Sequence, residues 1–79
     1  MKTLAVEAHK ILIDEPEGRR KIDLATAGNK TFKLWKVFSQ MPEQHRMKKS
    51  WVKDFFLAFP EMFVLVNDLS GVPHVSAKR

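Results

Sequence analysis

The chain contains no cysteine and no long apolar run, and each absence excludes a class of protein. Without cysteine there is neither a disulfide nor a cysteine-ligated zinc site, which fits a reducing compartment. The longest uninterrupted apolar runs are residues 55–59 and 62–66, far shorter than the ~20 residues that a membrane-spanning helix needs. The amino terminus also lacks the basic-then-apolar layout of a secretory signal. We therefore expect an intracellular domain outside the membrane, in the cytoplasm rather than the nucleus.

The sequence likewise lacks the motifs of a catalytic or metal site. His9, His45 and His74 are far apart and have no ligand-like neighbours, which argues against a metal site. There is no glycine-rich phosphate loop and no motif of an activated serine or cysteine. The acidic cluster of residues 14–17 is better explained as the end of a helix. We expect a protein that is not an enzyme and that binds no cofactor.

What the chain does contain is enough for one small core. It has 79 residues, of which 44% are hydrophobic, including six Phe and two Trp. That composition argues against disorder. At this size only about 60% of the unfolded surface can be buried, so every large apolar side chain matters. We expect residues 1–79 to form a single domain, monomeric in isolation, that is a piece of a longer protein.

Positive charge is concentrated in the middle of the chain. The net charge is +5, and by segment it is −2 in residues 1–18, +5 in 19–36, +2 in 37–54 and zero in the remainder. A positive field attracts polyanions. Many small domains are mildly basic without binding nucleic acid, so the charge alone does not decide the function.

Two helices and a short strand are predicted in the first half. Residues 3–14 carry apolar side chains at helical spacing, and Pro16 and Gly18 follow as a stop. Ile22 is placed to form a strand of one or two residues. Asp23 can cap a short helix through its carboxylate, and Gly28 can end it in a left-handed conformation.

The next two helices should carry most of the aromatic core. Asn29 or Thr31 can cap a helical piece whose Phe32, Trp35 and Phe38 share one face. Residues 41–47 are polar and are predicted to be a loop that begins at Pro42. Ser50 then has the character of an N-cap for a helix over residues 51–59, which Pro60 ends.

A β-hairpin is predicted at the end of the chain. Residues 62–66 are apolar and β-prone, which predicts a strand buried on both faces or nearly so. Residues 67–71 form a turn cluster of hairpin length, and residues 72–77 return as a second strand with Val75 and Ala77 facing inward. Pro73 cannot donate to a strand ladder and so predicts an edge strand.

This order of elements favours one fold, an α+β winged helix-turn-helix. It has a three-helix core, a short strand after the first helix and a C-terminal β-hairpin as the wing. A ferredoxin-like or OB fold needs more strands than the chain offers. A plain three-helix bundle leaves residues 62–77 without a role.

The residues SWVKDFFLAFPEMFVLV, 50–66, resemble the end of LOTUS (OST-HTH) domains and their egalitarian-like relatives. Those domains end in a helix of the form L-x-x-F-L-x-x-x-P-x-x-F that leads directly into a strand. KIDLATAG, residues 21–28, is similar to the strand-to-helix step of the same group. The resemblance covers residues 4–77 and implies a non-catalytic module of ribonucleoprotein factors. Some members bind RNA, including G-rich folded RNA, and a subset docks on a DEAD-box helicase.

The basic residues give the candidate binding sites. Cations at the start of the last helix suit phosphate oxygens, although a solvated helix start would carry the same residues. Trp51 can stack on a base or half-bury against the wing. The wing tip, residues 67–71, carries no Arg or Lys, which argues against a reader of duplex DNA. The candidates are Arg46, Lys48, Lys49 and Lys53, then Arg19, Arg20 and Lys21, then Lys33 and Lys36 beside Lys30.

Two functions are therefore expected. The first is RNA binding, favoured over duplex DNA and held by phosphate contacts. The alternative is a protein-interaction module that docks a helicase or another ribonucleoprotein partner. In that case an apolar patch or the predicted edge strand 72–77 receives the partner, because unpaired strand edges accept extended peptides.

Overall fold

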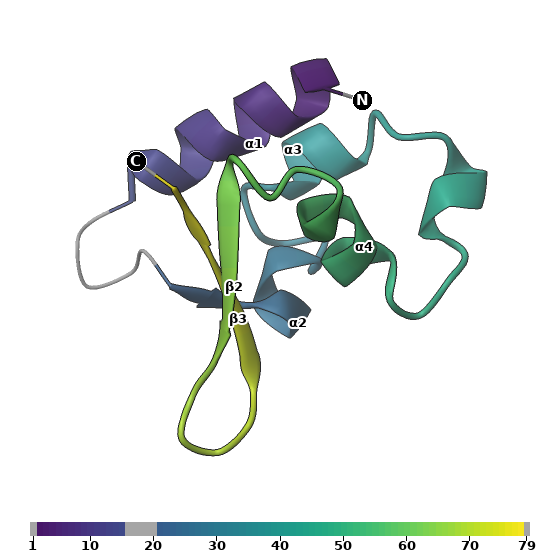
Figure 1. Ribbon diagram of the computed structural model, residues 1–79. Coiled ribbons are helices and arrows are strands. Elements are labelled where there is room, and N and C mark those ends of the chain that lie inside the picture. The colour runs from purple at the N-terminus through teal and green to yellow at the C-terminus, as the bar shows by residue number, and fades with distance from the viewer. Residues whose placement is uncertain (1, 16–20, 79) are drawn as a thin grey trace.

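A computed structural model describes residues 2–15 and 21–78, and its fold is α+β, as predicted. Figure 1 shows the helices grouped around a hairpin whose turn projects away from them. The elements, in chain order, are the helix α1 (Lys2–Ile13), the strand β1 (Ile22–Asp23), the helices α2 (Leu24–Ala27) and α3 (Trp35–Phe38), the 3-10 helix η2 (Glu43–Arg46), the helix α4 (Trp51–Leu57), and the strands β2 (Phe63–Asn67) and β3 (Pro73–Ala77).

The three strands form one antiparallel sheet in the order β1-β3-β2. β3 is therefore the central strand, and the prediction from Pro73 that it lies at an edge is wrong. A proline can stand in this central strand because β1 is short and pairs only with His74 and Val75. Pro73 pairs with Asn67 at the turn end of the hairpin, beyond the reach of β1. Its missing N–H therefore does not cost a bond to β1.

The position of β2 explains its exposure. Phe63 is buried, whereas Val64, Leu65 and Val66 are only half-buried. The sequence predicted a strand buried on nearly both faces. β2 instead forms one edge of the sheet, with β3 as its only strand partner among the described residues.

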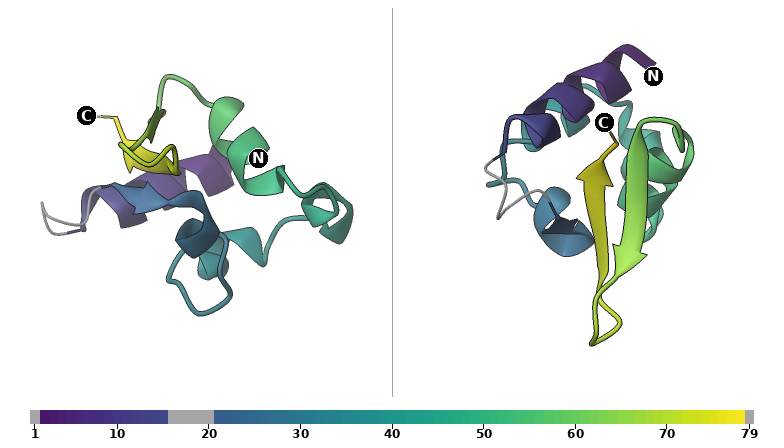
Figure 2. Two further views of the ribbon diagram at one scale, coloured as in Figure 1. Left: turned by 90° about the horizontal axis from the view of Figure 1, so that it is seen from below. Right: turned by 60° about the vertical axis from the view of Figure 1, so that its left-hand side comes forward.

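The core lies between α1, the sheet and α4. α1 contributes Ala5, Ala8 and Leu12, and its small residues let it pack closely against α3 and β3. Figure 1 and the right view of Figure 2 agree that α1 lies across the end of the strands opposite the hairpin turn. The remaining buried apolar residues are Ile22, Ala27, Leu34, Val37, Phe38, Met41, Val52, Phe55, Phe56, Phe63 and Val75.

A polar contact ties α1 to the end of the sheet. Nε2 of His9 lies 2.6 Å from the carbonyl oxygen of Lys78, and the His9 ring meets Phe63 edge-on with centroids 6.1 Å apart. A proton on Nε2 is thus donated to the backbone just after β3. His9 has a structural role here.

The start of α2 follows the sequence prediction, but its end does not. The Asp23 carboxylate accepts hydrogen bonds from the backbone N–H of Thr26 at 3.1 Å and from its hydroxyl at 2.6 Å. The hydroxyl bond is the main reason that the pKa of Asp23 is lowered. Gly28 has φ −89°, so the expected left-handed conformation is absent. Its value is space, because a Cβ there would lie 2.7 Å from Cγ2 of Val52 in α4.

α3 is shorter than expected and buries a different face. Leu34, Val37, Phe38 and Met41 are buried at the i, i+3, i+4, i+7 spacing of a helix. Trp35 is only half-buried, as is Phe32, so the predicted stripe of three aromatics is only partly in the core. The Asn29 side chain accepts from Thr31 in a turn, and α3 begins at Trp35 without a side-chain cap.

The segment between α3 and α4 is more ordered than a loose loop, because it contains η2. Ser50 precedes α4 as predicted, yet its hydroxyl makes no cap. It donates instead to the Asp54 carboxylate at 3.1 Å. α4 ends at Leu57, two residues earlier than predicted, since turns at 58–62 already prepare the entry into β2.

Candidate nucleic-acid interface

Two tryptophans lie together where α3 approaches the start of α4. The indoles of Trp35 and Trp51 meet edge to face with centroids 6.5 Å apart. Trp51 also packs edge-on against the buried ring of Phe38 at 5.0 Å. Both tryptophans are half-buried, so one part of each ring anchors it in the core and the other faces solvent. The packing gives both rings a fixed orientation at the surface.

Cations from two distant segments flank Trp35. The guanidinium carbon of Arg46, in η2, is 5.1 Å from the ring centroid, and Nζ of Lys30 is 5.8 Å from it. Both distances are in the range of a cation–π interaction. Nε of Arg46 is buried and makes no hydrogen bond. The contact with the Trp35 ring therefore holds the Arg46 side chain in place.

Two lysines lie on the other side of Trp51. Lys49 and Lys53 line a hollow between α2 and the start of α4, together with Gly28 and Val52. Both lysines are exposed. The close approach of α2 to α4 at Gly28 brings these cations beside the indole.

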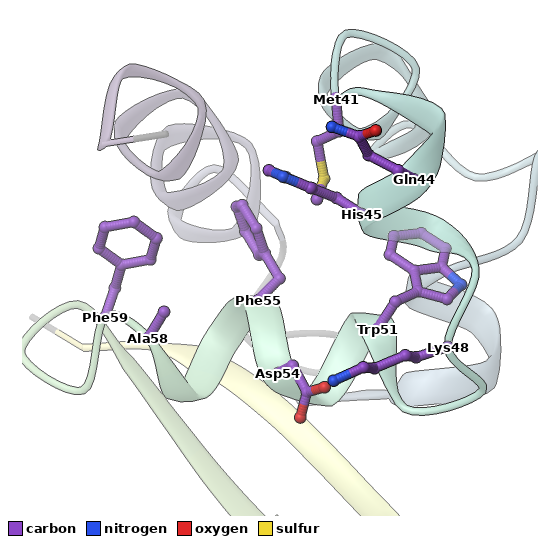
Figure 3. A pocket seen from close by; sticks show the side chains of 9 residues that line it. All are labelled: Met41, Gln44, His45, Lys48, Trp51, Asp54, Phe55, Ala58 and Phe59. Atoms are coloured by element: carbon purple, nitrogen blue, oxygen red, sulfur yellow. The ribbon is translucent and has the colours of Figure 1, made fainter.

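Lys48 lines a second hollow, on the face of α4 that looks toward η2 (Figure 3). A third hollow is lined by Lys30, Trp35 and Arg46. Trp51 contributes to all three hollows around it. The four residues placed first by the sequence, Arg46, Lys48, Lys49 and Lys53, thus come together around one indole. We call this the Trp51 surface and include Lys30 and Trp35 in it.

The remaining predicted cations do not join the Trp51 surface. Lys21 and Lys33 line a separate hollow that shares no residue with the three around Trp51. Nζ of Lys33 is 2.5 Å from Oε1 of Glu15, a buried carboxylate, so this lysine is occupied by an ion pair. Lys36 is exposed on α3. Arg19 and Arg20 lie outside the described residues.

Sequence reasoning missed the place of Trp35 and Lys30 in this surface. Its spacing of three residues from Phe32 and from Phe38 predicts that Trp35 lies in the core. The buried set is 34, 37, 38 and 41, and Trp35 lies next to that set rather than in it. The offset of one residue between Trp35 and this buried set is the sequence signal that could have placed Trp35 at the surface. Nothing in the sequence indicated that Lys30 and Arg46 would share one ring.

The hairpin turn has the opposite electrostatic character. Oδ1 of Asp68 accepts bonds of 2.9 Å from the backbone N–H groups of Ser70 and Val72 and from the Ser70 hydroxyl. The bond from Val72 is the main reason that the pKa of Asp68 is lowered, and it keeps the carboxylate charged. Leu69, beside it, is fully exposed. The turn therefore presents a negative charge and an apolar side chain.

Among residues 2–15 and 21–78, no group of three His, Asp or Glu side chains is arranged to hold a metal ion. No helix in the same ranges has the length and apolarity needed to cross a membrane.

No family model, no curated protein and no solved structure matches this chain. The resemblance to LOTUS domains thus rests on the residues quoted for it and stays a prediction.

Proposed function

We propose that this chain is a non-catalytic winged-helix module that binds RNA through the Trp51 surface. The winged-helix assignment is supported by the order of elements, with β1 before α2 and the hairpin β2–β3 after α4. It is further supported by the pairing of β1 with β3, which attaches the first strand to the hairpin. α4 then takes the place of the recognition helix.

One observation carries the proposed function, the gathering of five cations around two half-exposed indoles. Lys30, Arg46, Lys48, Lys49 and Lys53 come from three separate segments of the chain. Proteins that bind single-stranded nucleic acid combine a positive surface for phosphates with aromatic rings for bases. The Trp51 surface has both components.

The hairpin turn favours RNA over duplex DNA. A wing that enters a groove approaches phosphates from both strands, and the charged carboxylate of Asp68 would repel them. The turn also lacks any Lys or Arg. Single-stranded or irregular RNA can contact the Trp51 surface without meeting the turn.

Charge reversal with a matched control tests the proposal. Lys48→Glu with Lys49→Glu should remove most of the affinity for a single-stranded RNA in fluorescence anisotropy, since both side chains are exposed and belong to the surface. Lys2→Glu with Lys10→Glu changes the net charge equally on the exposed side of α1 and should change the affinity only slightly.

Salt supplies the second half of that test. The logarithm of the affinity of the wild-type protein should fall linearly with the logarithm of salt concentration, because phosphate contacts release counterions. The slope should be smaller for the Lys48/Lys49 variant than for the Lys2/Lys10 variant. RNA binding that ignores both salt and the Lys48/Lys49 reversal would refute the proposal.

A protein-interaction role is the second candidate, and one observation favours it. The outer edge of β2 has no strand partner among the described residues, and none of its five residues, FVLVN, is charged. Uncharged edges of this kind can accept an extended peptide. The edge at Val72–Ala77 proposed from the sequence is wrong, because β3 is paired on both sides. Amide shifts confined to residues 63–67 on addition of a partner, with none near Trp51, would favour this role.

A further inference from the structure

A groove runs along α4 on the side that faces η2, as Figure 3 shows. Its volume is about 360 Å³. One wall is a continuous face of α4 and the two residues after it, and the other wall comes from η2 and its flanks. The lining residues are Met41, Gln44, His45, Lys48, Trp51, Asp54, Phe55, Ala58 and Phe59.

Four rings contribute to this groove. Phe55 is 3% exposed and so lies deepest, while Trp51 and Phe59 are half-buried on either side of it along the chain. His45 is exposed and reaches over the groove from η2 (Figure 3). Ala58 leaves space between the rings because its side chain is a single methyl group. The groove is thus shaped for a flat and largely apolar chemical group.

The polar groups lie at the rim. Figure 3 shows Lys48 extending toward Asp54. The Asp54 carboxylate accepts a hydrogen bond from the Ser50 hydroxyl. Gln44 supplies an amide on the η2 side. A carboxylate at the rim repels a phosphate but accepts a hydrogen bond from an amino group. This groove therefore suits a neutral ring, in contrast to the lysines on the other side of Trp51.

We infer that the groove receives one unpaired nucleobase of the RNA whose phosphates contact Lys48 and Lys49. The inference rests on the proposed function and adds a base subsite to it. The base lies against the Trp51, Phe55 and Phe59 side of the groove, and its polar edge faces Asp54 and Gln44. A paired base has its flat faces covered by the neighbouring base pairs, so the subsite selects single-stranded or bulged RNA over a duplex.

Charge complementarity favours a base over a side chain of a protein partner. Trp51 and Lys48 belong both to the groove and to the Trp51 surface, so an occupant of the groove lies beside Lys48 and shares the Trp51 ring with the hollows that the other four cations line. A nucleotide brings a ring and a phosphate to the same place. An apolar peptide side chain would satisfy the rings alone.

The test fills the groove without changing charge. Ala58→Trp places a large ring in the groove, and Ala58 is exposed, so the fold should tolerate the change. Leu57→Trp is the control, because Leu57 is adjacent, 52% exposed and absent from the groove lining. Anisotropy is measured with a labelled single-stranded RNA nonamer and with the same strand in a duplex. Circular dichroism confirms that each variant is folded.

Ala58→Trp should weaken binding of the single strand roughly tenfold, since stacking on aromatic side chains accounts for about that much per base. It should leave the salt slope and the affinity for the duplex unchanged, and Leu57→Trp should change none of these values. If the single strand binds Ala58→Trp as tightly as wild type, with an intact salt slope, the groove holds no base and is left to a peptide side chain. Failure of the proposed function is a different result, because wild type would then show no salt-dependent binding at all.

Discussion

Replacing Gly28 by alanine probes the contact that sets the distance between α2 and α4. The added Cβ would lie 2.7 Å from Cγ2 of Val52, closer than two carbon atoms approach without a shift. Val52 is 9% exposed, and its branched side chain has little rotamer freedom in a helix. The backbone at Gly28 has φ −89°, which alanine adopts readily. The cost of this substitution is therefore steric.

The expected magnitude is a difference of two effects. Overpacking in a well-packed core costs about 1–3 kcal/mol. Alanine restricts the unfolded chain more than glycine does, which returns about 0.4–1 kcal/mol. The free energy of unfolding should therefore fall by about 1–2 kcal/mol, and Tm by about 4–8 °C per kcal/mol for a domain of this size.

Urea denaturation followed by tryptophan fluorescence measures this loss, and a double-mutant cycle identifies its cause. Val52→Ala removes the methyl group that clashes and by itself opens a cavity. The double variant, Gly28→Ala with Val52→Ala, should lose less unfolding free energy than the sum of the losses in the two single variants, because the clash no longer exists in it. An alanine variant at position 28 that is as stable as wild type would refute the steric explanation. So would losses that simply add.

Two further predictions concern the core and the hairpin turn. Phe38→Ala should lower the free energy of unfolding by about 3–5 kcal/mol in urea denaturation. The reason is that the Phe38 ring is fully buried and contacts the rings of Trp51, Phe55 and Phe56. A loss below about 1 kcal/mol would contradict this role. The pKa of Asp68 is lower in the folded than in the unfolded chain, so its contribution to stability is present above the unfolded pKa and is lost as pH falls through the folded pKa. Asp68→Asn should therefore flatten the acid limb of a Tm-against-pH curve, while Glu61→Gln, another exposed acid for which no such bonds are found, should leave it unchanged.

Local features of the chain could be predicted from sequence because neighbouring residues decide them. The Asp23 cap needs only Thr26 three residues later, and the short strand at Ile22 precedes it directly. The helix that follows Ser50 was predicted for the same reason, and it buries Val52, Phe55 and Phe56.

What the sequence could not supply depends on contacts between distant residues. The central position of β3 depends on its pairing with β1, some fifty residues earlier, as the register Ile22–Val75 shows. The sequence alone makes Lys33 a candidate phosphate contact, whereas the fold pairs it with Glu15. In the same way, the Trp51 surface exists only because Lys30, Arg46 and α4 are brought to one place.

The central strand is also the last of the three to be synthesised. β1 and β2 pair only with β3 among the described residues, so neither has a sheet partner until residues 73–77 are present. During translation the helices can collapse onto one another, but the sheet must wait until this segment has left the ribosome. Closing the long loop from β1 to β3 is then the entropically costly step, which favours a late and cooperative completion of the fold. A polypeptide truncated before Pro73 should lack the sheet altogether, rather than lose a single strand from it.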